Sequence, residues 1–309
     1  MTEHKNQLFE RVCLIGIGLI GSSLARMMRR TRVAGHIVAC ARSEATLETV
    51  TRLGLADSVT TDLAQAVTGA DLVIICTPVG VYEAIGRAIG PALSPGCIVS
   101  DVGSIKQAVI DALAPHLPDT VHLVPGHPIA GTEHSGPEAG FDTLFEGRWT
   151  LLTPPAGTDA AAVEKIAELW RRAGSRIDVM DPVHHDQVLA ITSHIPHLIA
   201  YTIVGTATDL EDHLKSEVIK YSAGGFRDFT RIAASDPVMW RDVFLNNRDA
   251  VLEMLGRFSE DLTQLQRFIR VGDGNAMEEL FTRTREIRRG VVEAQQHVPP
   301  APLDDDDGK

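Results

Sequence analysis

Residues 11–31 read RVCLIGIGLIGSSLARMMRRT, and this stretch decides the fold of the N-terminal part of the chain. Residues 11–17 form a short apolar run that is typical of a buried strand, and residues 19–30 have the spacing of a helix. Three glycines stand at the junction in the pattern Gly16-x-Gly18-x-x-Gly21. A buried strand that turns through glycines into a helix is typical of the first unit of a dinucleotide-binding fold.

Apolar strands and helical patterns alternate along the chain after this unit. Short apolar runs stand at residues 36–42, 71–78, 96–104 and 121–131, with helical patterns between them. Strands that are apolar on both faces predict a parallel sheet covered by helices on each side. The fold class is therefore α/β, with an N-terminal doubly wound Rossmann domain.

The second half of the chain is predicted to be helical nearly to its end. Residues 243–273 repeat apolar side chains at helical spacing over a long stretch. Such a stripe commonly packs against a partner subunit, so we expect a homodimer, with packing inside the same domain as the alternative. We predict a Rossmann domain over residues 1–180, a C-terminal all-helical substrate and dimerisation domain over 181–296, and a disordered tail over 297–309.

Composition and charge narrow the class of protein. The formal net charge of −12 argues against a nucleic-acid partner, because phosphate binding needs a positive surface. The sequence contains no run of 18 or more apolar residues, so we predict no membrane span. The N-terminus lacks the apolar core of a secretory signal. No pair of the four cysteines has the C-x-x-C spacing of a zinc or redox site. We therefore expect a cytoplasmic protein without a membrane partner.

The glycine turn predicts how a dinucleotide binds. Gly16 permits the tight turn, Gly18 lets the backbone approach a pyrophosphate, and Gly21 allows the helix to pack closely on the strand. The backbone N–H groups at the start of the helix, around Leu19 and Ile20, suit an anion. The alternative is a set of structural glycines without a ligand.

The end of the second strand indicates which dinucleotide is bound. NAD-binding folds place an acidic residue about 20 positions after the turn, whereas this chain has Ala41 followed by Arg42 and Ser43. A guanidinium and a hydroxyl without an acid favour a 2′-phosphate, so we predict NADP over NAD. The alternative is that Arg42 stacks on the adenine while NAD is still accepted. Thr77 and Pro78 end a later strand, where the chain passes the cofactor.

Ser104 and His127 follow the next two predicted strands, where ligands bind in open α/β sheets. A lone histidine is usually structural, but His127 follows a buried strand and stands between a glycine and a proline. Oxidation of an alcohol needs a base for the hydroxyl proton, and a neutral imidazole can act as that base near pH 7. Ser104 can hydrogen-bond to His127 or to the substrate hydroxyl, and Glu133 would be an acid of the pocket.

Several longer segments resemble one known family. GIGLIGSSLA, CTPV, DVGSIK, GHPIAGTEHSGP, TSHIPH and GGFRDFTRIAASDPVMWRD, in this order, are similar to the prephenate/arogenate dehydrogenases, in particular the bacterial cyclohexadienyl dehydrogenases. The likeness runs from about residue 11 to residue 270. It implies oxidative decarboxylation of prephenate or arogenate in tyrosine biosynthesis, with hydride transfer to NAD(P)+ and an active site between the two domains.

The resemblance also implies roles for particular residues. His127 matches the histidine that binds the ring hydroxyl and assists its deprotonation, and Ser104 matches the serine that supports this contact. Arg231 matches the arginine that pairs with a substrate carboxylate, and His194 and His197 match pocket histidines. Arg227, which stands four residues before Arg231, either binds an anion or pairs with a nearby aspartate.

Other interpretations remain open at this point. The histidine pairs 184/185 and 194/197 lack a third ligand at zinc-site spacing, so we predict no metal. A β-hydroxyacid or imine-type dehydrogenase would carry a lysine base on the first long helix of the helical domain, where this chain has histidines. A non-catalytic dinucleotide-binding sensor would need the glycine turn alone. No residue decides between prephenate and arogenate, or shows whether tyrosine inhibits the protein.

Overall fold

The computed structural model describes residues 7–132, 134–208, 217, 220 and 224–293. The chain divides into two compact units, Met1–Met254 and Leu255–Lys309. The predicted domain boundary after residue 180 stays a prediction, and the predicted tail over 297–309 lies outside the described residues.

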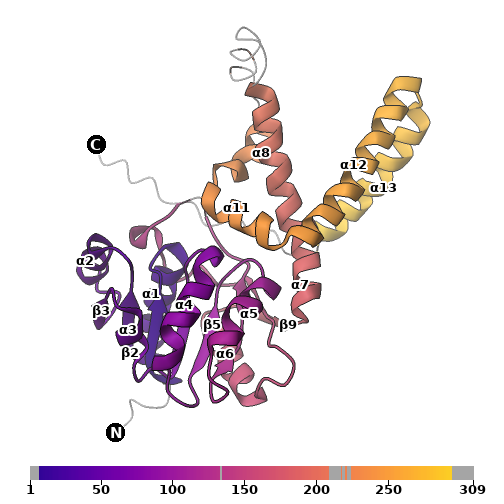
Figure 1. Ribbon diagram of the computed structural model, residues 1–309. Coiled ribbons are helices and arrows are strands. Elements are labelled where there is room, and N and C mark those ends of the chain that lie inside the picture. The colour runs from indigo at the N-terminus through magenta and orange to yellow at the C-terminus, as the bar shows by residue number, and fades with distance from the viewer. Residues whose placement is uncertain (1–6, 133, 209–216, 218–219, 221–223, 294–309) are drawn as a thin grey trace, which may run out of the picture. The chain divides into compact units, whose positions relative to one another are not determined.

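Six parallel strands form the main sheet, in the order β3-β2-β1-β4-β5-β6 (Figure 1). They are β1 (Phe9–Ile15), β2 (Ala34–Cys40), β3 (Ser58–Thr60), β4 (Leu72–Ile75), β5 (Ile98–Asp101) and β6 (His122–Leu123). The strand order changes direction between β1 and β4, so the carboxyl ends of these two strands border a crevice. The predicted doubly wound Rossmann fold is confirmed.

The central strands of the main sheet bury successive side chains on opposite faces. In β1, Val12 and Leu14 belong to one apolar cluster, whereas Cys13 and Ile15 belong to the other. The first cluster is completed by α1 (Leu19–Thr31), α2 (Glu44–Arg52) and α6 (Ala160–Arg172). The second is completed by α3 (Leu63–Val67), α4 (Tyr82–Ile89) and α5 (Gln107–Leu113). Burial on both faces explains why the buried parts of these strands are largely apolar.

A second, three-stranded sheet carries His127. It consists of β7 (Gly126–Pro128), β8 (Trp149–Leu152) and β9 (Arg176–Val179), with β7 antiparallel to β8. The single strand predicted over 121–131 is therefore two strands in two sheets, separated at Val124 and Pro125. Residue 127 pairs with Leu151 of β8, a four-residue strand that the sequence did not predict.

The remainder of the described chain is helical, as predicted. Its elements are α7 (Pro182–Leu189), a π turn η6 (Ala190–His194), α8 (Ile195–Thr208), α10 (Gly224–Thr230), a 3-10 turn η7 (Arg231–Ala234), α11 (Pro237–Asn246), α12 (Arg248–Val271) and α13 (Gly274–Glu293). Single 3-10 turns occur at η2 (Val79–Val81), η3 (Gly90–Ala92), η4 (Ala114–His116) and η5 (Pro137–Ala139). The π turn comes just before Pro196, which has no N–H for the helical ladder.

The helical stretch Pro182–Ala207 is long and apolar enough to cross a membrane by length and composition alone. It nevertheless buries the polar side chains His185, Asp186 and His194. Asp186 accepts a hydrogen bond from the backbone N–H of Lys106, which follows β5 of the main sheet. These contacts are those of a helix packed against protein, and the absence of a membrane partner stays a prediction.

Two glycines of the turn make a matched test of the packing. A Cβ on Gly21 would lie 2.1 Å from the carbonyl oxygen of Gly16, whereas one on Gly18 would meet nothing within 4 Å. We expect Gly21→Ala to lower the free energy of unfolding by roughly 1–3 kcal/mol, because β1 and α1 must separate. Gly18→Ala should lower it by less than about 1 kcal/mol in the same denaturant titration. Equal losses in both variants would contradict this account of Gly21.

Candidate active site

The turn between β1 and α1 has an open backbone. Gly16 has a φ of +94°, and a Cβ there would lie 2.9 Å from the backbone carbon of Cys76. Gly18 begins α1 without a side-chain cap and has open space beside it. The first N–H groups of α1, which include those of Leu19 and Ile20, have no acceptor within the helix. This arrangement fits the pyrophosphate of a dinucleotide.

Thr77 lies beside this turn at the end of β4. Its Oγ1 is fully buried and has no hydrogen-bond partner among the described residues. Its Cγ2 would lie 2.9 Å from a Cβ on Gly16, so the two residues are in contact distance. Pro78, the next residue, is exposed. An unpartnered hydroxyl next to an open glycine turn also fits a bound dinucleotide.

The end of β2 lies next to β1 in the sheet. Ala41 is half-buried, whereas Arg42 and Ser43 are exposed. The Ser43 hydroxyl accepts the N–H of Thr46 at 3.4 Å and so caps α2. Within the described part of the chain, Arg42 has no ion-pair partner. The guanidinium is therefore available to a ligand at this edge of the sheet.

A buried ion pair connects the end of β5 with the start of β7. Lys106 Nζ lies 2.6 Å from Asp101 Oδ2, and both side chains are 0% exposed. The same Nζ donates to the carbonyl oxygen of Gly126 at 2.7 Å. Burial lowers the pKa of Lys106, and the Asp101 carboxylate opposes that shift. The two sheets are thereby joined at the residue that precedes His127.

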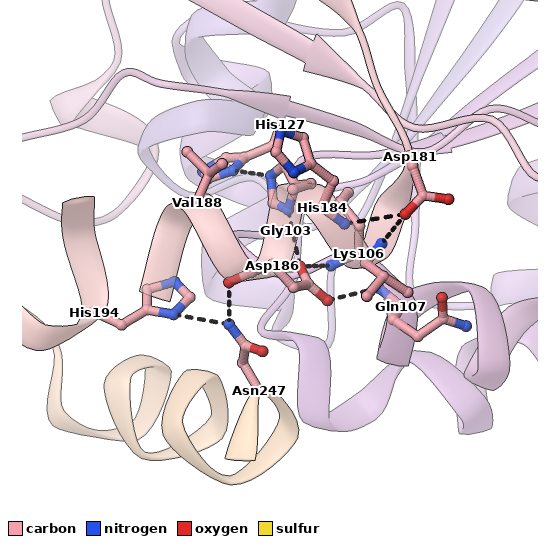
Figure 2. A network of polar contacts seen from close by, with 12 residues as sticks. Gly103, Lys106, Gln107, His127, Asp181, His184, Asp186, Val188, His194 and Asn247 are labelled. Carbon is pink, nitrogen blue, oxygen red and sulfur yellow. Dashed lines mark hydrogen bonds and ion pairs between the residues drawn. The ribbon is translucent and has the colours of Figure 1, made fainter. Parts of the chain in front are cut away.

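His127 is the first member of a buried hydrogen-bonded chain (Figure 2). Its Nδ1 lies 2.9 Å from Nε2 of His185, and Nδ1 of His185 lies 2.8 Å from Oδ1 of Asp186. Asp186 also accepts the backbone N–H groups of Lys106 at 2.8 Å and Gln107 at 2.9 Å. The carboxylate thus joins α7 to the start of α5.

The surroundings of His127 keep its ring neutral. Burial lowers the pKa of His127 well below its usual range, and His185, Lys106 and His194 add to the effect. A neutral ring has one nitrogen with a lone pair, as a general base requires. Ser104 is half-buried in the loop after β5, and among the described contacts its hydroxyl is not hydrogen-bonded to His127.

His194 ends the π turn, and Asn247 determines which nitrogen of its neutral ring carries the proton. The Asn247 Nδ2 amide donates to the carbonyl oxygen of Asp186 at 2.9 Å and lies 3.1 Å from His194 Nδ1. Since the amide nitrogen can only donate, Nδ1 accepts and the neutral ring carries its proton on Nε2. Among the described residues, that Nε2 is buried without a well-formed hydrogen bond, although the Ser104 backbone lies close enough to His194 to raise its pKa. The Nε2 donor can therefore still be taken up by a ligand oxygen.

His197 and Arg231 lie near each other on the helical side of the site. The ring of His197 stacks on Trp240 at 3.6 Å between centroids, and its Nδ1 donates to the Ser193 carbonyl at 2.9 Å. Burial lowers the pKa of His197, and the charge of Arg231 lowers it further. Arg231 is exposed at the start of η7. Trp240 contacts both pocket histidines.

The structure does not place two other predicted site residues in this group. The Arg227 side chain is 80% exposed and lies 3.9 Å from Asp228, one of the aspartate partners considered for it. Glu133 lies outside the described residues. Across the described residues, no three histidine, cysteine or acidic side chains gather as metal ligands. The predictions that Glu133 and Arg227 contact substrate, and that no metal binds, remain untested.

Sequence reasoning missed five polar residues of the site. They are Asp101, Lys106, His185, Asp186 and Asn247, all of them buried. In the sequence, His185 was considered only as a possible metal ligand, and Asp186 was given no role. One signal in the sequence could have indicated them: polar residues that stand beside buried apolar stretches are candidates for buried polar contacts. Their mutual contacts depend on β5 and α7 meeting in space, which sequence spacing does not show.

The fold and the site define an NAD(P)-binding oxidoreductase with a buried histidine network. Residues 24–179 match the family model of the prephenate dehydrogenase nucleotide-binding domain, and residues 181–283 match that of the prephenate dehydrogenase dimerization domain. The cyclohexadienyl dehydrogenase of Zymomonas mobilis is 42% identical to the chain over 281 residues, which are 91% of this chain and 96% of that protein.

Two solved structures are also similar. Prephenate dehydrogenase from Aquifex aeolicus, in complex with hydroxyphenyl propionate and NAD+, has a TM-score of 0.83 at 33% identity, covering 92% of this chain and 98% of that one. Arogenate dehydrogenase from Synechocystis has a TM-score of 0.77 at 26% identity, covering 91% and 99%. The chain belongs to the prephenate dehydrogenase family.

The buried state of His194 makes stability depend on pH. Burial lowers the pKa of His194 from 6.5 to about 4, with the Asp186 carboxylate opposing the shift. The unfolded chain therefore binds a proton at a higher pH than the folded chain does. Between pH 6.5 and 4, this residue should remove about 3 kcal/mol from the free energy of unfolding as the pH falls.

Denaturant titrations from pH 7 to pH 4 measure this contribution. We expect His194→Gln to show a smaller loss of stability over that range, whereas the exposed His184→Gln control should follow the original protein. Identical pH slopes for all three proteins would contradict the assignment.

Proposed function

We propose that this oxidoreductase catalyses the oxidative decarboxylation of prephenate or arogenate, yielding 4-hydroxyphenylpyruvate or tyrosine. The observation that carries the proposal is the neutral, buried His127, bonded through Nδ1 to His185 at 2.9 Å. It is supported by family membership and by relatives named cyclohexadienyl, prephenate and arogenate dehydrogenase.

The substrate class explains why a base is needed. When bound, the oxidised nicotinamide would supply the acceptor for the hydride on the ring carbon that bears the hydroxyl. His127 takes the hydroxyl proton as the C–H bond breaks. The ring carboxylate leaves as carbon dioxide, the electron pair of the broken C–C bond completes the aromatic ring, and the ring oxygen recovers its proton from His127. Ser104, in the loop after β5, would hold the hydroxyl from the other side.

The helical side of the site would bind the substrate carboxylates. Arg231 can pair with a carboxylate through two N–H groups, which fixes orientation as well as charge. His194 offers the buried Nε2 donor described above. His197, stacked on Trp240, would line the same pocket. Glu133 and Arg227 are proposed as substrate-binding residues from their places in the sequence alone.

The cofactor is NAD or NADP, and we propose NADP. The carrying observation is the end of β2, where Ala41 replaces the usual acid and the exposed Arg42 has no ion-pair partner among the described residues. The Ser43 hydroxyl stands next to it at the start of α2. Gly16, Gly18 and Gly21, with Thr77 and Pro78, would hold the pyrophosphate and the nicotinamide half.

We also propose that the protein works as a cytoplasmic homodimer. Residues 181–283 match a dimerization-domain model. The long helices α12 and α13 expose large apolar side chains that a second subunit would cover: Leu252, Leu262, Ile269, Phe281 and Ile287. Exposed apolar side chains at this density are typical of a subunit interface.

The two competing functions fit the site less well. A β-hydroxyacid or imine-type dehydrogenase needs a lysine base on the long helix, but Pro182–Thr208 contains no lysine. A dinucleotide sensor would need the glycine turn but not the buried series of hydrogen bonds from Asp186 through His185 to His127. The proposed reaction accounts for both features.

Initial-rate assays with prephenate and arogenate, each with NAD+ and NADP+, test the proposal. We expect turnover of at least one diene and a higher kcat/KM with NADP+. His127→Ala should lower kcat by roughly two to four orders of magnitude, because the hydroxyl proton loses its acceptor.

Three results would count against these assignments. A protein that oxidises neither diene contradicts the proposed function. Undiminished turnover in His127→Ala removes the catalytic role of that residue. A clear preference for NAD+ overturns the inference from Ala41 and Arg42. His122→Ala, on the half-buried end of β6, serves as the control for loss of an unrelated histidine.

A further inference from the structure

A carboxylate stands at the far end of the chain that begins on His127. Asp186 is 5% exposed and accepts three hydrogen bonds: from His185 Nδ1 at 2.8 Å, and from the backbone N–H groups of Lys106 at 2.8 Å and Gln107 at 2.9 Å. Backbone N–H groups can only donate, so the carboxylate oxygens are acceptors in this arrangement. Asp186 therefore requires that His185 carry a proton on Nδ1.

The next link follows from the protonation of His185. Burial lowers the pKa of His185, although the neighbouring Asp186 opposes the shift, and the neutral ring has a bare Nε2. That Nε2 lies 2.9 Å from Nδ1 of His127. Since one of the two nitrogens must donate, the proton sits on Nδ1 of His127. The Nε2 atom of His127 is then the bare nitrogen.

We propose that His185 and Asp186 are positioning residues that hold His127 in the tautomer with a free Nε2, aimed at the substrate hydroxyl. This inference rests on the proposed function for its chemical purpose, but the tautomer itself does not depend on it. Nε2 makes no hydrogen bond with any other described residue, and it is not among the fully buried atoms that lack a partner. It therefore stays open to a ligand.

The site then contains two histidines with opposite roles. Asn247 fixes His194 with its proton on Nε2, whereas Asp186 fixes His127 with its proton on Nδ1. The same residue, Asp186, takes part in both, because its backbone carbonyl accepts from Asn247 at 2.9 Å. One ring is left as a proton acceptor and the other as a hydrogen-bond donor.

His185 is the residue to change, because Asp186 also holds the start of α5. His185→Phe keeps a ring of similar shape but removes both hydrogen bonds. We expect kcat to fall roughly 10- to 100-fold, as for other partners that orient an active histidine, while KM for the diene changes less than about threefold. His185→Gln should recover part of kcat, since its amide oxygen can still accept from Nδ1 of His127.

His184→Phe is the matched control. His184 is the neighbouring residue on α7, is exposed, and bonds to Asp181 only through its backbone N–H at 3.0 Å. This variant should keep the kcat of the original protein.

Nitrogen NMR of the full-length protein labelled with 15N-histidine observes the tautomer directly. Bare and protonated ring nitrogens resonate far apart, and His127→Gln identifies the signals of His127. We expect a protonated Nδ1 and a bare Nε2 in the original protein at pH 7, and a mixture of tautomers in His185→Phe. A merely structural role for His185 would not shift these signals.

The outcomes separate the two proposals. A protonated Nε2 on His127 in the original protein overturns the positioning role, as does a His185→Phe enzyme with unchanged kcat. If His185→Phe does not fold by circular dichroism, His185→Gln decides: kcat as low as that of His127→Ala counts against the role, and partial activity supports it. If the original protein oxidises neither diene, the proposed function fails, while the tautomer measurement, which needs no substrate, still tests the hydrogen-bonded chain.

Discussion

The buried ion pair between Lys106 and Asp101 is the contact on which the rest of the site depends. Removing one partner of such a pair leaves an unpaired buried charge, at a cost of about 3–5 kcal/mol. Lys106 does more than neutralise Asp101, because its Nζ also binds the carbonyl oxygen of Gly126 at 2.7 Å. Its backbone N–H binds Asp186 at 2.8 Å. A single residue thus connects the strand that carries His127 with the carboxylate that orients it.

This arrangement explains how a histidine in a crowded interior remains useful. Burial keeps the ring of His127 neutral, and its Nδ1 is hydrogen-bonded to His185. On the helical side, Asn247 leaves His194 with a donor, Nε2, that has no well-formed hydrogen bond among the described residues. Buried polar groups without full hydrogen bonding are costly, so a donor left unpaired in this way is most easily understood as a ligand contact. In the proposed reaction, that ligand is the diene.

The fold could be predicted from the sequence because its signals are local. The central strands of the main sheet end in short apolar or nearly apolar runs, such as residues 12–15 and 72–75, and Gly16, Gly18 and Gly21 mark the first turn. The sequence predicted His127 as the base from its neighbours, but not its place in a second sheet, because Pro125 separates two very short strands. Lys106, His185 and Asp186 were missed for a different reason. Their partners are distant in the sequence, as the 80-residue separation of Lys106 and Asp186 shows.

The central claim is that His127 presents a bare Nε2 to the hydroxyl of the substrate. A crystal structure with oxidised dinucleotide and a saturated analogue of the diene, which keeps the hydroxyl but cannot become aromatic, tests this most directly. The account predicts that the hydroxyl oxygen lies about 2.6–3.2 Å from His127 Nε2 while Nδ1 remains bonded to His185. A hydroxyl held by other residues, with His127 Nε2 out of contact, would contradict it.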